Sequence, residues 1–209
     1  MTRREAPSVN AGSMADIAFL LLIFFLVSTT IETDQGISRK LPPPPKKDVI
    51  IPKIKEKNLF RVEVNQLNDL LVEGSPIKLE ELKEAAKAFL DNGGGTNEDA
   101  CDYCQGLRDS KSSDNPIKAV ISLKNSRETD YATYIAVQNE LVKAYTELRN
   151  RESIKRYGIS YSEMIENLKD AKDTQDQSRL RERIKNVQSM YPEKLSEAET
   201  KSSQSLNTL

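Results

Sequence analysis

The chain of 209 residues has no histidine and no tryptophan, and it has only two cysteines. Without histidine there is no Ser-His-Asp triad, no Cys-His dyad and no histidine-containing zinc or haem site. Net charge is also nearly absent, because 31 Lys and Arg residues are balanced by 32 Asp and Glu residues. Dedicated nucleic-acid-binding domains carry a basic patch or stripe, so we expect no nucleic acid among the partners.

Apolar residues are concentrated in one long run near the N-terminus. The mean hydropathy of the whole chain is −0.58, yet residues 15–31 read ADIAFLLLIFFLVSTTI and contain a single charge, Asp16. At about 1.5 Å of rise per residue, such a helix covers roughly 25 Å, which approaches the thickness of a bilayer core. We therefore predict one transmembrane helix over residues 14–31, preceded by a short N-terminal segment, residues 1–13.

Two other interpretations of this run stay open. A basic start (Arg3, Arg4) before an apolar stretch is typical of a cleaved signal peptide, although no A-x-A-like cleavage site follows Val27. A helix in a soluble core is the other alternative. The positive-inside rule does not decide the orientation of a span here, because basic residues lie on both sides of it and the following segment is long.

Asp16 is the residue of this run that says most about function. An ionisable residue in a membrane helix is a candidate functional site, since a carboxyl that gains and loses a proton there can move protons. The competing interpretation is an interfacial cap at the helix N-terminus. Steps of three and four place Leu20, Ile23 and Val27 on the face of Asp16. We expect this face to meet protein rather than lipid.

The next segment, residues 32–57, has the composition of a tether. Leu41 precedes four consecutive prolines, which favour a polyproline II rod. About 26 residues at roughly 3 Å each reach on the order of 80 Å. We predict a semi-stiff Pro/Lys-rich linker that acts as a spacer. Specific contact of its basic residues with lipid or cell wall is the alternative.

Residues 58–149 carry the pattern of a small α+β domain. Period-two alternation and turn formers indicate a strand pair, and apolar residues at helical spacing indicate two helices around a further buried strand. An unpaired strand edge in such a domain can accept a strand from a second copy or from an extended peptide. The predicted order is ββαβα, over residues 59–64, 70–73, 79–90, 119–123 and 131–148.

The remaining residues, 150–209, form a highly charged tail. Residues 175–190 have the pattern of a helix with one apolar stripe. Lys194–Ser196 either returns to the sheet as a closing strand or leaves the sheet edge open. From Ser202 onward the composition is typical of disorder. The stripe consists of Leu180, Ile184 and Val187.

Taken together, these features resemble the ExbD/TolR family. The stretch SMADIAFLLLIFFLV, residues 13–27, is similar to the signature helix of that family, which carries a single Asp near its start. A Pro-containing basic linker, a hairpin, a helix, a strand and a second helix opened by Asp130 and Tyr131 extend the resemblance to Leu148. The long tail is similar to that of Bacteroidetes-like members of the ExbD branch.

The resemblance implies a function for the chain. It implies a non-enzymatic subunit of a proton-driven motor in the bacterial inner membrane, with no catalytic residue, metal or cofactor and with Asp16 as the proton-translocating residue. It implies a single-pass chain with a cytoplasmic N-terminus and a periplasmic domain. The partners implied are a second copy, a ring of ExbB-like subunits, the lipid bilayer and a TonB-like periplasmic protein. A passive membrane-tethered module that binds protein or cell wall is the alternative.

Both cysteines lie in an insertion rich in Gly, Asp and Ser, residues 91–116. Cys101 and Cys104 form a C-x-x-C motif, whereas a thioredoxin-like site would follow a strand and open a helix. Two thiolates without histidine make a poor zinc site. If the domain is periplasmic, a local disulfide is favoured. Free or interchain thiols and a metal or redox function, including an anchored thiol oxidoreductase, are the alternatives.

Overall fold

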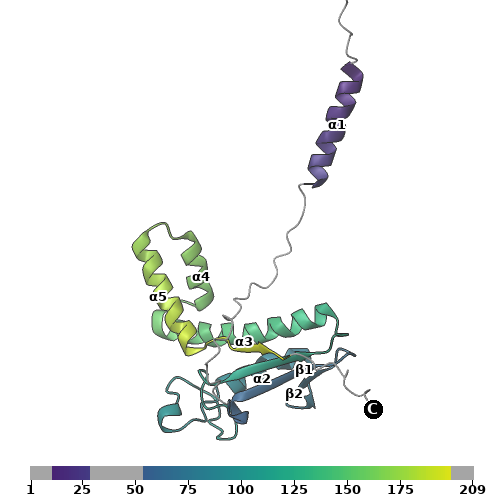
Figure 1. Ribbon diagram of the computed structural model, residues 1–209. Coiled ribbons are helices and arrows are strands. Elements are labelled where there is room, and N and C mark those ends of the chain that lie inside the picture. Colours follow the sequence, from purple (N-terminus) through teal and green to yellow (C-terminus); the bar gives the residue numbers. More distant parts are fainter. Residues whose placement is uncertain (1–10, 29–53, 199–209) are drawn as a thin grey trace, which may run out of the picture. The chain divides into compact units, whose positions relative to one another are not determined.

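The computed structural model describes residues 11–28 and 54–198. Residues 1–10, 29–53 and 199–209 lie outside the described residues, as do the side chains of residues 27 and 28. Most of the predicted N-terminal segment, most of the predicted linker and the whole of the tail end predicted to be disordered fall there. The chain divides into two units between residues 50 and 51, and each is described by itself (Figure 1).

Helix α1 (Ala11–Ser28) is the described part of the first unit. Residues Ile17–Leu26 are all apolar, and their side chains are exposed. Within the described ranges, no helix combines the length and the apolar character needed to cross a membrane. The predicted span, residues 14–31, continues past Ser28 into residues that are not described, and it stays a prediction.

A five-stranded mixed sheet forms the centre of the second unit, in the order β3-β2-β1-β4-β5. The neighbours β1 and β2, and β2 and β3, are antiparallel, whereas β4 runs parallel to both β1 and β5. Asn65 shapes the turn between β1 and β2, because its side-chain oxygen accepts from the backbone N–H groups of Leu67 and Asp69, each at 2.8 Å. The strands are β1 (Leu59–Val64), β2 (Leu70–Val72), β3 (Ser75–Pro76), β4 (Val120–Asn125) and β5 (Leu195–Glu197).

Two helices cover the apolar face of this sheet. Helix α2 (Leu79–Leu90) and helix α3 (Tyr131–Tyr157) contribute their apolar faces to one core together with β1 and β4. The period of two in β1 turns Phe60, Val62 and Val64 toward the helices. The α+β class and the strand pair, helix, strand, helix order of the prediction are confirmed. The sequence interpretation omitted β3.

The predicted second helix, residues 131–148, was too short. Helix α3 continues to Tyr157 and ends at Gly158, whose φ of 73° is the left-handed conformation that glycine adopts without strain. The extension escaped prediction because it buries polar side chains, Glu152 and Ser153, rather than an apolar stripe.

A helical hairpin follows α3. Helix α4 (Tyr161–Asp170), which the sequence did not predict, lies beside α5 (Thr174–Met190) (Figure 1). The two helices enclose a second hydrophobic cluster that is built around Tyr161, Met164, Ile184 and Val187. The chain then returns to the sheet as β5, so the closing-strand alternative is the one that the structure contains.

The packing of α2 against α3 should dominate the stability of this unit. Leu82 is fully buried in the main core, so Leu82→Ala should lower the free energy of unfolding by about 2–5 kcal/mol. Chemical denaturation followed by circular dichroism measures this change. As a matched control, Leu67→Ala in the exposed turn should change it by less than about 0.5 kcal/mol. Equal losses in the two variants would contradict the assignment of the core.

Candidate functional site

Asp16 lies in the second turn of α1, not at its start. The helix begins at Ala11, and its first turn contains no acidic residue. Side chains near the positive end of a helix dipole gain stability only within the first turn, so an N-terminal cap does not account for Asp16. Asp16 is also the only charged residue of α1. Leu20 and Ile23 follow it at helical spacing and are exposed, while the side chain of Val27 is not described.

In the second unit, the insertion at residues 91–116 is closed by a disulfide between Cys101 and Cys104. Both cysteines are buried, and their Cα atoms are 5.5 Å apart. Gly93 packs directly against this bridge with a φ of +66°, and an added Cβ there would lie 2.7 Å from the Cβ of Cys104. Glycine at this position therefore serves both the backbone conformation and the close approach of the disulfide.

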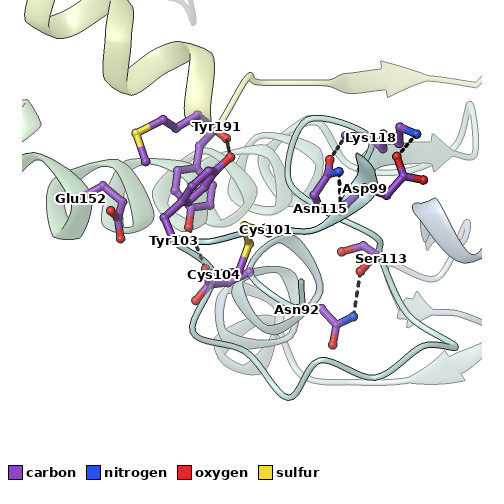
Figure 2. Close-up of a disulfide and its surroundings, with 12 residues drawn as sticks. Asn92, Asp99, Cys101, Tyr103, Cys104, Ser113, Asn115, Lys118, Glu152 and Tyr191 are labelled. Carbon is purple, nitrogen blue, oxygen red and sulfur yellow. Dashed lines mark hydrogen bonds and ion pairs between the residues drawn. A yellow bond between two sulfur atoms is a disulfide. The ribbon is translucent and has the colours of Figure 1, made fainter. Parts of the chain in front are cut away.

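Apart from a short 3-10 helix at Asn97–Asp99, the rest of the insertion is fixed by side-chain and loop hydrogen bonds. The buried side chain of Asn92 donates to the carbonyl oxygens of Asp109 and Ser113, each at 2.8 Å, and accepts from the N–H of Asp109 at 3.0 Å. The N–H groups of Gly94 and Gly95 donate to the carbonyls of Ser113 and Asp114. Figure 2 shows Asn92 beside Ser113 and below the disulfide. A segment that reads as a solvated loop is therefore ordered, with buried residues at both of its ends and at the two cysteines, while most of the stretches between them are exposed.

One end of the insertion holds the first residues of the domain. The buried carboxylate of Asp114 accepts from Asn58 Nδ2 at 3.0 Å, and the backbone N–H of Asp114 donates to Asn58 Oδ1 at 2.7 Å. Asp114 also forms ion pairs with Lys57 and, at 3.4 Å, with Lys55. Because residues 55–57 are the last of the predicted linker and Asn58 directly precedes β1, Asp114 fixes the point where the domain begins.

Hydrogen bonds and nearby positive charges keep the carboxyl of Asp114 ionised. Burial by itself raises the pKa of the Asp114 carboxyl, but hydrogen bonds from Lys57 and Asn58 and the positive charges of Lys57 and Lys55 outweigh it, so the pKa is lowered. Asp99, in the same insertion, also has a lowered pKa, chiefly because Lys118 donates to it. Both carboxylates are therefore charged at neutral pH, and each has lysine partners.

The other end of the insertion holds the tail. Arg151 on α3 donates from its two terminal nitrogens to the carboxylate of Asp91, at 2.6 and 2.8 Å. Tyr191, which follows α5 and is fully buried, donates its hydroxyl to Asp91 at 2.7 Å. Arg149 donates from two nitrogens to the carbonyl oxygen of Tyr191, at 3.0 and 2.8 Å. Asp91 and Tyr191, 100 residues apart in sequence, thus share one buried polar cluster.

Tyr103 completes this cluster from inside the disulfide ring. Its ring meets that of Tyr191 edge-to-face at 5.5 Å, and its hydroxyl donates to the carbonyl oxygen of Met190 at 2.8 Å. Burial, followed by the negative charge of Glu152, raises the pKa of Tyr103 to about 12. Burial and the hydrogen bond to Asp91 raise the pKa of Tyr191 as well. Both phenols are therefore neutral donors at physiological pH.

The insertion thus joins two parts of the chain that the sequence interpretation kept separate. Pattern reasoning identified Cys101 and Cys104 but missed Asp91, Asn58 and Asp114, which are polar residues without periodicity. The one usable signal was aromatic, since Tyr103 and Tyr191 stand in otherwise polar segments. Among the described residues, no group of three or more His, Cys, Asp or Glu side chains could hold a metal ion. The arrangement is suited to holding chain segments together rather than to chemistry.

Comparison with known protein families gives a match over most of the chain. The family described as biopolymer transport protein ExbD/TolR matches residues 2–152. This range contains α1, the predicted linker, the first four strands, α2 and most of α3. The hairpin α4–α5 and the strand β5 lie beyond it. No curated protein matches the chain.

The Asp114 contacts predict a specific dependence of stability on pH. Because the pKa of Asp114 is lowered by folding, its contribution is complete above the ordinary carboxyl pKa of about 4 and is lost as the pH falls through the lower folded value. Asp114→Asn should therefore lower the stability by about 1–3 kcal/mol at pH 7. At acidic pH the difference from the wild type should shrink, since the wild-type carboxyl is then neutral too.

Thermal unfolding between pH 3 and pH 7 measures this convergence. The matched control is Asp102→Asn, an exposed carboxylate of the same insertion, which should leave the curve unchanged. A difference between wild type and Asp114→Asn that stays constant over the whole pH range would show that the charge of Asp114 contributes nothing.

Proposed function

Because the chain belongs to the ExbD/TolR family, we propose that it is a subunit of an inner-membrane motor that couples proton flow to a TonB-like protein for energised outer-membrane transport. The family is non-enzymatic transport machinery, and its members are biopolymer transport proteins. Membership implies partnership in the ExbB/TonB system in general. The motor role, the proton path and the individual partners are the proposed part.

The position of Asp16 is the observation that carries this proposal. It is a lone carboxyl inside an otherwise uncharged apolar helix, beyond the turn where a capping role would place it. A charged group in such surroundings is costly in a membrane, and such groups face protein or water and mark ion or proton paths. Asp16 therefore fits the proton-translocating residue that the family resemblance implies.

The energy available at such a site is sufficient for coupling. Moving one elementary charge through 100 mV is worth about 2.3 kcal/mol. A carboxyl that binds a proton from one side and releases it to the other can therefore bias a motion by several times the thermal energy. The face formed by Asp16, Leu20, Ile23 and Val27 is proposed to meet ExbB-like ring subunits and the α1 of a second copy. The span proposed for the bilayer is residues 14–31.

The proposed location places the second unit in the periplasm, at the end of a linker over residues 32–57, with residues 1–13 in the cytoplasm. The disulfide between Cys101 and Cys104 supports this location, because disulfides persist in oxidising compartments such as the periplasm and are rare in the cytosol. The Pro-rich linker is proposed to carry motion from the membrane to the domain and, through it, to the TonB-like partner.

Replacing the proton carrier tests the motor directly. Asp16→Asn keeps the size of the side chain but removes the titratable group. Energised outer-membrane uptake should then fall to the level of a deletion strain, with the protein still present in the membrane at its normal amount. Uptake of a labelled substrate, with immunoblots of membrane fractions, measures both quantities.

The matched control is Asp34→Asn, which removes a carboxylate from the predicted linker and should leave uptake near the wild-type level. Full uptake by Asp16→Asn, in a strain without a second copy of the gene, would favour the passive membrane-tethered module. Loss of uptake together with loss of the protein from the membrane would instead assign Asp16 to assembly.

The proposed topology has its own test. Alkaline phosphatase, which is active only in the periplasm, should be active when fused after residue 198 and inactive when fused after residue 10. The chain should stay with inner-membrane vesicles in alkaline carbonate, which removes proteins held only by charge. Release of the chain into the carbonate supernatant, or the reverse pattern of phosphatase activity, would contradict the predicted span or its orientation.

A further inference from the structure

We propose that the disulfide-closed insertion, residues 91–116, is a latch that holds the edge strand β5 on the sheet and so sets how often that strand detaches. The latch rests on the packing of the second unit alone. It holds whether or not Asp16 moves protons.

Taken alone, β5 is a weakly attached strand. It has three residues, two of them exposed, and among the strands that the structure describes it pairs only with β4. Hydrogen bonds flank the pairing at both ends, from Ile121 N–H to Lys194 at 2.9 Å and from Ala198 N–H to Leu123 at 2.9 Å. Its side chains add two contacts, since the half-buried Leu195 packs against the edge of the main core and the exposed Glu197 accepts from Tyr134 and Gln138 on α3. Short exposed edge strands open readily, so an additional constraint is needed to keep β5 in place.

The firm attachment lies just before β5, at Tyr191. This residue is fully buried, and Met190 beside it is nearly so. Its hydroxyl, its ring and its backbone carbonyl are all engaged, by Asp91, Tyr103 and Arg149 respectively. Because only a few residues separate Tyr191 from Leu195, movement of Tyr191 out of its site would carry β5 away from β4.

The insertion supplies two of these contacts, and the disulfide fixes one of them. Tyr103 lies between Cys101 and Cys104, inside the ring that the bridge closes. Figure 2 shows Tyr103 below Tyr191, with the disulfide beside it. A covalent ring of this size restricts the backbone at Tyr103, so its hydroxyl and ring are held in position for Met190 and Tyr191 before they bind. Breaking the bridge should loosen that contact first.

Release of β5 would uncover the outer edge of β4. The backbone groups of β4 that pair with β5 would then be free to pair with an extended segment of another chain. The disulfide thus controls how often the outer edge of β4 is exposed, although the two cysteines lie in a loop that is separate from β4 and β5.

Hydrogen exchange on the full-length oxidised chain in detergent micelles tests the latch. In the variant Cys101→Ser/Cys104→Ser, the amides of Ile121 and Ala198, which bond across the β4–β5 interface, should exchange about tenfold faster. The amides of Glu73 and Ile77, which donate to the carbonyl oxygens of Arg61 in β1 and Leu70 in β2, should keep their wild-type rates. Tyr103→Leu retains the disulfide and should reproduce this selective change.

The matched control is Leu82→Ala, a core change away from the insertion, which should speed exchange at both sets of amides alike. The latch is refuted if the double serine variant and Tyr103→Leu leave Ile121 and Ala198 unchanged. It is equally refuted if both variants raise the exchange rates of the two sets of amides by the same factor, as expected for Leu82→Ala. The insertion would then contribute only to the general stability of the unit.

Discussion

The parallel pairing of β1 with β4 is the interaction on which the rest of the second unit depends. It runs in register from Leu59 opposite Val120 to Val64 opposite Asn125. Parallel neighbours need a long connection, and here that connection contains the hairpin partner β2, helix α2 and the whole insertion. The paired strands present Phe60, Val62 and Leu123 on one face, against which α2 and α3 pack. The outer strands β2 and β5 then attach to the two free sides of this central pair.

Sequence patterns predicted the parts of this fold that follow from local periodicity. Alternation located β1, and the apolar stripes located α2, α5 and the first two thirds of α3, because each element must bury one face. The same logic failed where polar side chains are buried. The last part of α3 was missed because the side chains that it buries, Glu152 and Ser153, are polar. No periodic pattern of apolar residues marks such positions. The contacts of the insertion were missed for a related reason, since the hydrogen-bond partners Asp91 and Tyr191 lie 100 residues apart in the sequence.

The candidate site shows the same division. Asp16 could be selected from sequence, because a single charge in an apolar helix is conspicuous. That Asp16 lies in the second turn of α1 could be established only from the structure, which shows that the helix begins at Ala11. Of the contacts in the insertion, the sequence indicated the disulfide between Cys101 and Cys104 but none of the polar contacts. Family membership covers residues 2–152, yet the buried cluster joins Asp91 and Arg151 within that range to Tyr191 beyond it. The additional hairpin α4–α5 and β5 are therefore packed into the family domain as part of one unit.

The common direction of β1, β4 and β5 has a mechanical consequence. A pull applied at Leu59 along the axis of β1 slides that strand past β4, so the hydrogen bonds between them are loaded together in shear rather than opened one after another. Asn58 is tied to Asp114 immediately ahead of β1, which places a polar clamp where the load arrives. Six residue pairs join β1 to β4, but only three join β4 to β5. Of the two parallel rows, the one between β4 and β5 is therefore the weaker under tension along the strands, and the one between β1 and β4 is the stronger.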